Sequence, residues 1–254
     1  MCTFDLKTWT GRTGNNILQL LSCIKYCIDN NIRILKIPDH PFFILKTNII
    51  CENGCNCQKI INVLPLHNNI YDNTIPIQDL KKLYDTYVSC IIYHKYNIPT
   101  YDICIHIRSG DTFSPNPHPY YVPLPLNYYK NIINKNKDKK IKIVYECTRN
   151  PIINLLISEY KDTITFQRKS LVEDIQDMAD CRTLVVSPGT FFYLPYFISK
   201  TINSIIIPDY IYKLTKFGNL YGELFNVIPL PNYIELGKWS LSQEDINKLI
   251  TYKN

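Results

Sequence analysis

The stretch Tyr101-Asp-Ile-Cys-Ile-His-Ile-Arg-Ser-Gly-Asp111 decides the fold. Its apolar first half, residues 101–105, reads as a buried strand that delivers His106, Arg108 and Asp111 at its carboxyl end. Such side chains suit a ligand better than a core, because open α/β sheets bind ligands at the carboxyl edge of their strands. There Arg108 can hold a phosphate with two parallel hydrogen bonds, and Asp111 can fix the arginine or orient the turn. The alternative is a structural Arg–Asp pair on the surface.

Helices and strands alternate on both sides of this stretch. Before it, a strand at 2–6, a glycine-containing turn, a helix at 17–28 and a strand at 32–37 form a βαβ opening, followed by a long helix at 77–96. After it, the predicted strands are 141–145, 163–166, 184–187 and 204–207, and the predicted helices are 126–134, 151–160, 171–181, 190–199 and 241–252. Ser240 or Ser242 caps the last helix. This alternation predicts an α/β fold.

The chain breaks into two βαβ-type halves near Asn97-Ile-Pro99-Thr100, a plausible hinge. The prediction is a Rossmann-like N-terminal lobe at 1–97 and a second lobe at 98–239, with the ligand in a cleft between the lobes. The final helix belongs to residues 240–254, and packing back on the N-terminal lobe is one option for it. A single continuous sheet is the alternative architecture.

Composition narrows the class of protein. The 254 residues are 46% hydrophobic, which allows a substantial core, and the net charge of +6 suits an anionic ligand. The lysine-rich run 135–142 reads as a solvated loop, because no aromatic platform or recognition motif accompanies it, so nucleic acid is not an expected partner. The N-terminus resembles no signal peptide and no apolar run reaches the ~20 residues of a membrane span, so we expect a soluble, cytoplasmic protein. The oligomeric state stays open.

The ten cysteines are irregularly spaced, and several lie in apolar runs, where they behave as small buried hydrophobes. Cys51, Cys55 and Cys57 could hold zinc with His67, but their spacing fits no standard finger or ribbon. We predict free thiols in a reducing compartment. A disulfide among Cys51, Cys55 and Cys57 is the remaining alternative.

Two further motifs flank the central one. Gly11-Arg12-Thr-Gly14-Asn15-Asn16 follows the first strand, where glycines permit a tight turn and a close approach to another molecule. Ser187-Pro188-Gly189-Thr190-Phe191 follows a buried strand and precedes a helix, where hydroxyls and backbone N–H groups can form an anion site. The ordinary alternatives are a plain strand–helix turn for the first motif and helix capping by Ser187 or Thr190 for the second.

These motifs, with Val144-Tyr-Glu-Cys-Thr-Arg-Asn-Pro151 between them, resemble the α-1,2-fucosyltransferases in content and order, over residues 3–28 and 101–208. They also resemble the wider superfamily of α-1,6- and protein O-fucosyltransferases. The resemblance implies a GT-B-like fold with two Rossmann-like lobes, an inverting reaction without a bound metal or other cofactor, a GDP-sugar donor and a glycan acceptor.

The resemblance also implies roles for particular residues. Arg108 would contact the diphosphate and His106 the nucleotide. The phosphate and ribose side would be lined by Ser187, Pro188, Gly189, Thr190 and Phe191, and the N-terminal lobe would contribute Arg12, Gly14 and Asn15. The chain departs from the family pattern at Asn16, where glutamine is usual, and at Arg149-Asn150, where paired acids are usual. It also departs at 188–193, where Pro-Gly-Thr-Phe-Phe-Tyr replaces a Ser-Ser-Phe-Ser-Trp-Trp-like run.

The expected reaction is attack of a sugar hydroxyl on the anomeric carbon of GDP-L-fucose, with Arg108 and Asp111 as the catalytic pair. Arg108 would stabilise the departing diphosphate as a metal ion does elsewhere. Asp111, His118 and Asp39 are candidate general bases, and the loop with His118, Tyr120 and Tyr121 could fold over the ligand. The alternatives are another nucleotide sugar or a catalytically silent nucleotide- or glycan-binding protein. A dinucleotide redox enzyme is disfavoured, because the G-x-G-x-x-G fingerprint and its acidic ribose partner are missing.

Overall fold

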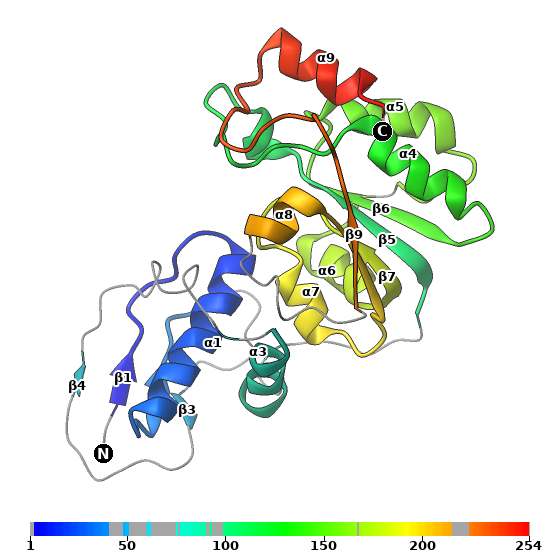
Figure 1. Cartoon of the computed structure of the whole chain (residues 1–254). Coiled ribbons are helices and arrows are strands. Elements are labelled where there is room, and N and C mark those ends of the chain that lie inside the picture. The colour runs from blue at the N-terminus through cyan, green and yellow to red at the C-terminus, as the bar shows by residue number, and fades with distance from the viewer. Residues whose placement is uncertain are drawn as a thin grey trace. The chain divides into compact units, whose positions relative to one another are not determined.

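The computed structural model divides the chain into two compact units (Figure 1). The N-terminal unit comprises Met1–Lys95 with Thr190–Ile198 and Thr215–Leu220, and the C-terminal unit comprises Tyr96–Gly189, Ser199–Leu214 and Tyr221–Asn254. The structure describes residues 3–40, 48–50, 60–61, 75, 77–89, 92, 99–166, 168–214 and 224–253. Cys51, Cys55, Cys57 and His67, the alternative zinc or disulfide group, lie outside the described residues, as does most of 90–98.

The N-terminal unit is built on a small mixed sheet. Its strands are β1 (Thr3–Asp5), β2 (Ile34–Lys36), β3 (Asn48–Ile50) and β4 (Ile60–Ile61), in the order β3-β2-β1-β4. β1 pairs in parallel with β2 and β4, whereas β2 and β3 are antiparallel. The helix α1 (Thr13–Asp29) connects β1 to β2, which confirms the predicted βαβ opening.

Helix α1 buries the apolar stripe that its sequence predicts, since Ile17, Leu20, Leu21, Ile24 and Cys27 are all buried. It packs against α3 (Ile77–Leu83) and α7 (Tyr193–Ile198) of the same unit. The helix predicted over 77–96 changes character at Tyr84, where α3 passes into one π-helical turn, η1 (Tyr84–Val88). Stacking of the Tyr84 ring on Phe197, with centroids 6.0 Å apart, fixes this turn against α7.

The C-terminal unit is built on a fully parallel five-stranded sheet. Its strands are β5 (Tyr101–Ile107), β6 (Ile141–Tyr145), β7 (Cys181–Val185), β8 (Ser204–Pro208) and β9 (Phe225–Ile228), in the order β6-β5-β7-β8-β9. The strand predicted over 163–166 is reduced to a single parallel bridge between Thr165 and Lys142 of β6. Counting that bridge as a strand gives the order 3-2-1-4-5-6, which is that of the dinucleotide-binding folds.

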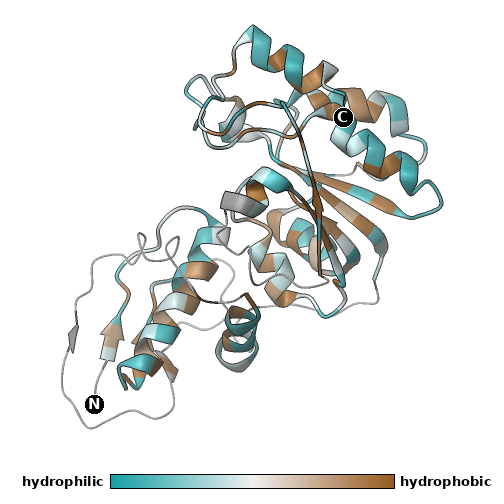
Figure 2. Ribbon diagram, in the orientation of Figure 1, coloured by the Kyte–Doolittle hydropathy of each residue, from teal (hydrophilic) through white to brown (hydrophobic). Residues whose placement is uncertain are grey.

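Helices cover both faces of this sheet (Figure 1). On one face α4 (Leu126–Lys135) and α5 (Pro151–Tyr160) share a core with Ile103, Ile105 and Ile107 of β5. On the other face α6 (Leu171–Ala179) packs against β5 and β7. A short helix, α8 (Asp209–Leu214), follows β8 and packs on it. The strands of this unit are hydrophobic along most of their length (Figure 2), as expected for a parallel sheet that is covered on both sides.

The last helix, α9 (Gln243–Thr251), packs against α4 in the C-terminal unit. Leu249 and the preceding Trp239 are buried in the core that α4 and α5 share, and packing of the helix on the N-terminal lobe stays a prediction. Ser242 caps the helix, accepting a hydrogen bond from the Asp245 backbone N–H at 3.1 Å, and the Asp245 carboxylate accepts one from the Ser240 hydroxyl at 2.8 Å.

The observed α/β class confirms the predicted fold class, with a parallel Rossmann-like sheet in the C-terminal unit and a small mixed sheet with a βαβ opening in the N-terminal unit. Several predicted boundaries shift. Strand β7 begins at Cys181, three residues before its prediction, because α6 ends at Ala179. Helix α7 begins at Tyr193 and not at Thr190. Pro151 does open α5, and the Asn150 side chain caps it.

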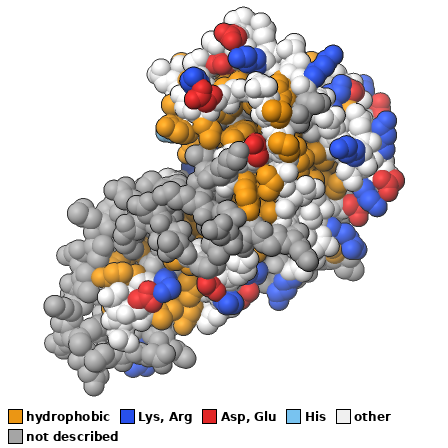
Figure 3. Space-filling model, viewed as in Figure 1, with side chains coloured by type: hydrophobic (Ala, Val, Ile, Leu, Met, Phe, Trp, Pro, Cys, Tyr) orange, Lys and Arg blue, Asp and Glu red, His pale blue; other side chains and the backbone are white. Residues whose placement is uncertain are grey.

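Charged side chains of both signs are interspersed on the face that Figure 3 shows. Several form ion pairs, such as Lys130 with Glu159 at 2.7 Å and Lys139 with Asp138 at 3.1 Å. The lysines near the start of β6 thus lie among acidic neighbours. No described helix has the length and apolar character needed to cross a membrane.

Candidate functional site

The carboxyl edge of the C-terminal sheet brings two of the predicted motifs together. The chain leaves β5 through Arg108 and leaves β7 through Ser187-Pro188-Gly189, and β5 and β7 are neighbours in the sheet. They are also the strands at which the order reverses, because β6 follows β5 in the chain but pairs on its other side. Parallel α/β sheets bind ligands at this kind of switch point. The position therefore marks a candidate ligand site.

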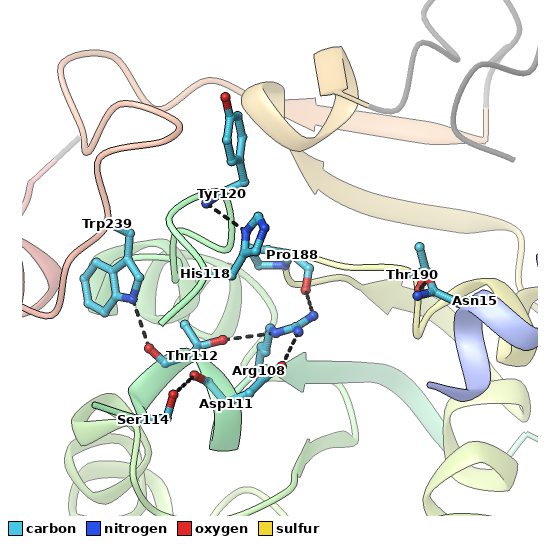
Figure 4. A network of polar contacts seen from close by, with 10 residues as sticks. All are labelled: Asn15, Arg108, Asp111, Thr112, Ser114, His118, Tyr120, Pro188, Thr190 and Trp239. Carbon is cyan, nitrogen blue, oxygen red and sulfur yellow. Dashed lines mark hydrogen bonds and ion pairs between the residues drawn. The ribbon is translucent and has the colours of Figure 1, made fainter. Parts of the chain in front are cut away.

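Each nitrogen of the Arg108 guanidinium makes one hydrogen bond (Figure 4). Nε donates to Thr112 Oγ1 at 3.0 Å, Nη1 to the Pro188 carbonyl at 2.9 Å and Nη2 to Asp111 Oδ2 at 2.9 Å. The Tyr121 ring stacks on the group, with its centroid 3.8 Å from Cζ. These four contacts fix the position and the plane of the guanidinium, so its two remaining N–H groups, which donate to none of the described residues, have set directions.

The Arg108–Asp111 ion pair confirms that the aspartate can fix the arginine, and the ordinary alternative of a surface pair does not describe it well. Only 15% of the Arg108 side chain is exposed, against 37% for Asp111. Among the described residues, the guanidinium bonds one carboxylate, that of Asp111. The other two hydrogen bonds of the guanidinium go to the neutral Thr112 hydroxyl and the neutral Pro188 carbonyl. The arrangement holds a cation in place and leaves it able to bind an anionic group.

Gly189 is required by Arg108. A Cβ atom on Gly189 would lie 2.1 Å from Arg108 Nη1, and the φ of +116° at this residue is itself unfavourable for any side chain. The missing side chain lets the loop after β7 turn its Pro188 carbonyl onto the guanidinium. Pro188 and Gly189 therefore position Arg108, whatever else they contact.

His106 is the last polar residue of β5 and pairs with Ser187 across the switch point. Ser187 Oγ and His106 Nδ1 share a hydrogen bond of 2.9 Å, and Ser187 is almost fully buried. Burial, and secondarily the charge of Arg108, lower the pKa of His106 from 6.5 to about 3. The imidazole is therefore neutral at neutral pH, and it can donate or accept a hydrogen bond but brings no positive charge to a phosphate.

A loop that the sequence pattern did not single out as part of the site supports the Arg108 turn. In the loop between β6 and α5, Asn150 donates from Nδ2 to the Arg108 carbonyl at 3.0 Å and from its backbone N–H to Ser109 Oγ at 3.2 Å. Ser109 Oγ also lies 3.2 Å from Cys147 Sγ. Asn150, which stands where the family pattern has an acid, thus both caps α5 and holds the arginine turn. In the sequence its place before Pro151 and its position in the family-like motif 144–151 marked it, but not its contacts with the arginine turn.

The Pro-rich loop after the arginine turn is anchored through its backbone carbonyls. Trp239 Nε1 donates to the Thr112 carbonyl at 2.9 Å, Tyr210 OH to the Val122 carbonyl at 2.6 Å and Tyr233 OH to the Pro123 carbonyl at 2.9 Å. Between these anchors lie the exposed His118 and Tyr120. The sequence placed the loop near the ligand, but the Tyr121–Arg108 stack and the aromatic anchors depend on tertiary packing and could not be read from it.

The first and third motifs meet in the N-terminal unit. A Cβ on Gly14 would lie 2.2 Å from the Thr190 carbonyl oxygen, so only glycine permits this approach of α1. Thr190 Oγ1 donates to Asn15 Oδ1 at 2.6 Å. Arg12 lies exposed at the start of α1, where its carbonyl accepts from the Asn16 N–H at 3.0 Å. Ligand contacts by Arg12, Gly14, Asn15, Thr190 and the partly exposed Phe191 stay predictions.

The alternative that Ser187 or Thr190 caps the following helix is wrong, and an anion site at these residues stays a prediction. Neither hydroxyl caps α7, which begins at Tyr193. The Ser187 hydroxyl pairs with His106, and the Thr190 hydroxyl with Asn15. Any anion held at the switch point therefore depends on Arg108 and on backbone groups of the loop rather than on the end of a helix.

The three candidate bases lie in different surroundings. Asp111 is paired with Arg108 at 2.9 Å. His118 is exposed, with its ring 4.9 Å from the Tyr121 ring, and Asp39 is exposed in the N-terminal unit. Within the described residues, no three His, Cys, Asp or Glu side chains are grouped closely enough to hold a metal ion.

The lowered pKa of His106 predicts how the free energy of unfolding changes with pH. In the folded protein His106 takes up a proton only around its pKa of about 3, whereas in the unfolded chain it does so near pH 6.5. Stability contributed by the neutral ring is therefore lost as pH falls below 6.5. His106→Asn keeps a hydrogen-bonding group for Ser187 and cannot titrate. Urea unfolding at pH 7 and pH 5 should show wild type losing up to about 2 kcal/mol more than the variant. Equal losses in both would contradict a neutral imidazole in the folded protein.

Comparison with known proteins identifies the family. The sequence model of glycosyl transferase family 11 matches residues 88–214, half of the chain, including both the Arg108 turn and the loop after β7. Among solved structures, the chain is similar to the E. coli heptosyltransferase WaaC with ADP, at 13% identity and a TM-score of 0.37, covering 64% of this chain and 44% of that one. With the same enzyme bound to ADP-2-deoxy-2-fluoro heptose, the identity is 12% and the TM-score 0.36, and the match covers 69% of this chain and 57% of that one.

The chain thus spans about half the length of these two structures. No curated protein matches it significantly. The family match confirms the resemblance to the fucosyltransferase superfamily over residues 88–214, which include the second and third motifs. The chain belongs to glycosyl transferase family 11.

Proposed function

We propose that this glycosyltransferase is an inverting fucosyltransferase that moves L-fucose from GDP-L-fucose to a sugar hydroxyl, in an α-1,2-like reaction that uses no metal ion. The observation that carries the proposal is the fixed guanidinium of Arg108 at the switch point of a nucleotide-binding type of sheet. The family match supports it, because the matched residues contain every contact of that guanidinium.

In the proposed reaction, a hydroxyl oxygen of the acceptor attacks the anomeric carbon of the donor sugar. A new glycosidic bond forms on one face while the bond to the GDP oxygen breaks on the other, which inverts the anomeric centre. The electron pair of the broken bond leaves with GDP, and the hydroxyl proton goes to a base. Arg108 would stabilise the charge that develops on the diphosphate. It needs no reorganisation at that moment, because Thr112, Asp111, Pro188 and Tyr121 already hold it.

The demand on the base is modest if bond breaking runs ahead of bond making, because an oxocarbenium-like carbon attracts even a neutral hydroxyl. Asp111, His118 and Asp39 remain the candidate proton acceptors. Asp111 is the one held at the guanidinium, where it orients Arg108. His106 would contact the nucleotide as a neutral hydrogen-bonding group.

A thermal-shift panel tests the donor class. We expect GDP, GDP-fucose and GDP-mannose to raise the melting temperature by roughly 5–10 °C at a hundred times their Kd, since such a ligand adds about 2.7 kcal/mol to the stability. UDP and ADP should shift it less, and addition of a chelator should leave the shifts unchanged. A preference for UDP that needs manganese would refute both the donor and the metal-free reaction.

Catalysis is tested separately from binding. With GDP-fucose as the ligand, release of free GDP reports transfer to water or to an added glycan. Binding without any turnover over a broad set of acceptor glycans would favour the second candidate, a catalytically silent nucleotide-binding protein. That candidate is kept because Arg149 and Asn150 replace the paired acids of the family pattern.

A further inference from the structure

Glu146 occupies a defined place beside the arginine turn. It is the first residue after β6, the strand that pairs with β5 on the side opposite β7. Its side chain is exposed, and its carboxylate lies against the backbone of Gly110. A Cβ atom on Gly110 would be 2.3 Å from Glu146 Oε2, and Gly110 has a φ of +62°. The glycine two residues after Arg108 thus makes room for this carboxylate at the carboxyl edge of the sheet.

The turns that carry Arg108 and Glu146 are held together as one unit. Asn150 bonds both the Arg108 carbonyl and the Ser109 hydroxyl, and Cys147 lies within hydrogen-bonding distance of that hydroxyl. Asn150 is itself fixed at the start of α5, where its side chain accepts from the Ile152 N–H at 3.1 Å. The backbone segments that carry the carboxylate and the guanidinium are therefore held side by side, as two contacts to a single ligand require.

The chemistry of Glu146 complements that of Arg108. An ionised carboxylate only accepts hydrogen bonds, and its two oxygens can accept from two neighbouring hydroxyls at once. Beside a diphosphate such a group is unfavourable unless it faces an uncharged donor. In sheets with the strand order seen here, the pyrophosphate lies at the turn after the first strand, and an acidic side chain further along the unit accepts from the ribose hydroxyls. β5 and β6 are the first and second strands of that pattern.

We propose that Glu146 binds the ribose diol of the donor nucleotide and so makes the site selective for ribonucleotides. The proposal rests on the proposed function, because it takes the diphosphate at Arg108 as given. The sequence showed no acidic ribose partner because the dinucleotide fingerprint that would locate one is absent, and the partner becomes visible only when β6 is seen beside β5.

Calorimetric titration of GDP, 2′-deoxy-GDP and 3′-deoxy-GDP into the full chain tests the role of Glu146. Wild type should bind GDP about tenfold or more tightly than either deoxynucleotide, as expected for hydrogen bonds to a charged group. Glu146→Gln should weaken GDP binding by a similar factor and leave the affinities for the two deoxynucleotides nearly unchanged. The preference for GDP over the deoxynucleotides should therefore disappear. Glu159→Gln is the matched control, since Glu159 is a carboxylate of the same unit that pairs with Lys130 on α4.

The outcomes separate the inference from the function on which it rests. If wild type binds GDP and Glu146→Gln keeps the full preference for the ribonucleotide, the ribose contact is wrong and the proposed function stands. If wild type binds another nucleoside diphosphate in place of GDP, the same comparison with its deoxy forms decides the role of Glu146. If wild type binds no nucleoside diphosphate, both proposals fail. Because Glu146 is exposed, Glu146→Gln should melt like wild type, and the melting curve checks that the variant is folded.

Discussion

Arg108→Lys should lower the rate of GDP release from GDP-fucose at least a hundredfold, which corresponds to about 3 kcal/mol of transition-state stabilisation. Lysine keeps the charge but replaces a planar group with a single flexible ammonium, which cannot hold Thr112, Asp111 and the Pro188 carbonyl while binding a phosphate. The measurement is kcat/KM for donor hydrolysis, which requires no knowledge of the acceptor.

Lysine is chosen in preference to alanine because Arg108→Ala leaves the partly buried Asp111 carboxylate without its counter-charge and can unfold the turn. The matched control is Arg182→Lys. Arg182 lies on β7 of the same sheet, but its side chain is exposed and its ion pair with Asp102 is loose, with 4.0 Å between Nε and Oδ1. A folded Arg108→Lys protein that turns over GDP-fucose at the wild-type rate would end the proposed mechanism, and so would an equal loss in Arg182→Lys.

Gly189→Ala should have an effect of similar size, on the order of a hundredfold, although the added methyl group carries no charge. The new Cβ would overlap Arg108 Nη1, so either the guanidinium moves or the loop after β7 retreats and withdraws the Pro188 carbonyl. Both responses misplace the group that would face the diphosphate. The measurement is again kcat/KM for donor hydrolysis, together with the Kd for GDP.

Gly237→Ala separates this clash from backbone strain. Gly237 also has a positive φ, of +85°, but the nearest atom to its Cβ would be Tyr120 Cζ at an ordinary 3.5 Å. Alanine costs about 1 kcal/mol or more of stability at such a position whatever the space around it. We therefore expect both variants to melt at lower temperature and only Gly189→Ala to lose most of its activity. A parallel loss of activity in Gly237→Ala would show that strain alone accounts for the effect.

The sequence predicted the fold well where a pattern is local. The strand at 101–107, the helix opened by Pro151 and the βαβ start follow from apolar runs, a proline and a glycine turn within a few residues of each other. Prediction from the sequence failed where contacts with residues distant in the chain determine the secondary structure. β9 was not predicted, because Phe225–Ile228 is short and shows its character only beside β8. Thr163–Phe166 was predicted as a strand but forms a single bridge at Thr165.

The candidate site shows the same division. Arg108, Asp111 and Gly189 were found from their residue types at strand ends, and contacts among them are present. Thr112, Asn150 and Glu146 were not assigned roles, and Tyr121 was placed only in a loop that could fold over the ligand, because each acts through a contact that the sequence does not show. A hydroxyl or amide that supports an arginine has no sequence pattern of its own.

The three aromatic anchors of the Pro-rich loop all bond to main-chain carbonyls, at Thr112, Val122 and Pro123. Every residue type has that carbonyl, so the attachment places little restriction on which side chains the loop presents. Residues 115–117, 119 and 120 can therefore be exchanged, with Ser114 and His118 kept, while the ends of the loop keep their places beside Arg108. That property makes this loop the natural site for combinatorial libraries, in which the surface next to the arginine is varied and the machinery beneath it is left intact.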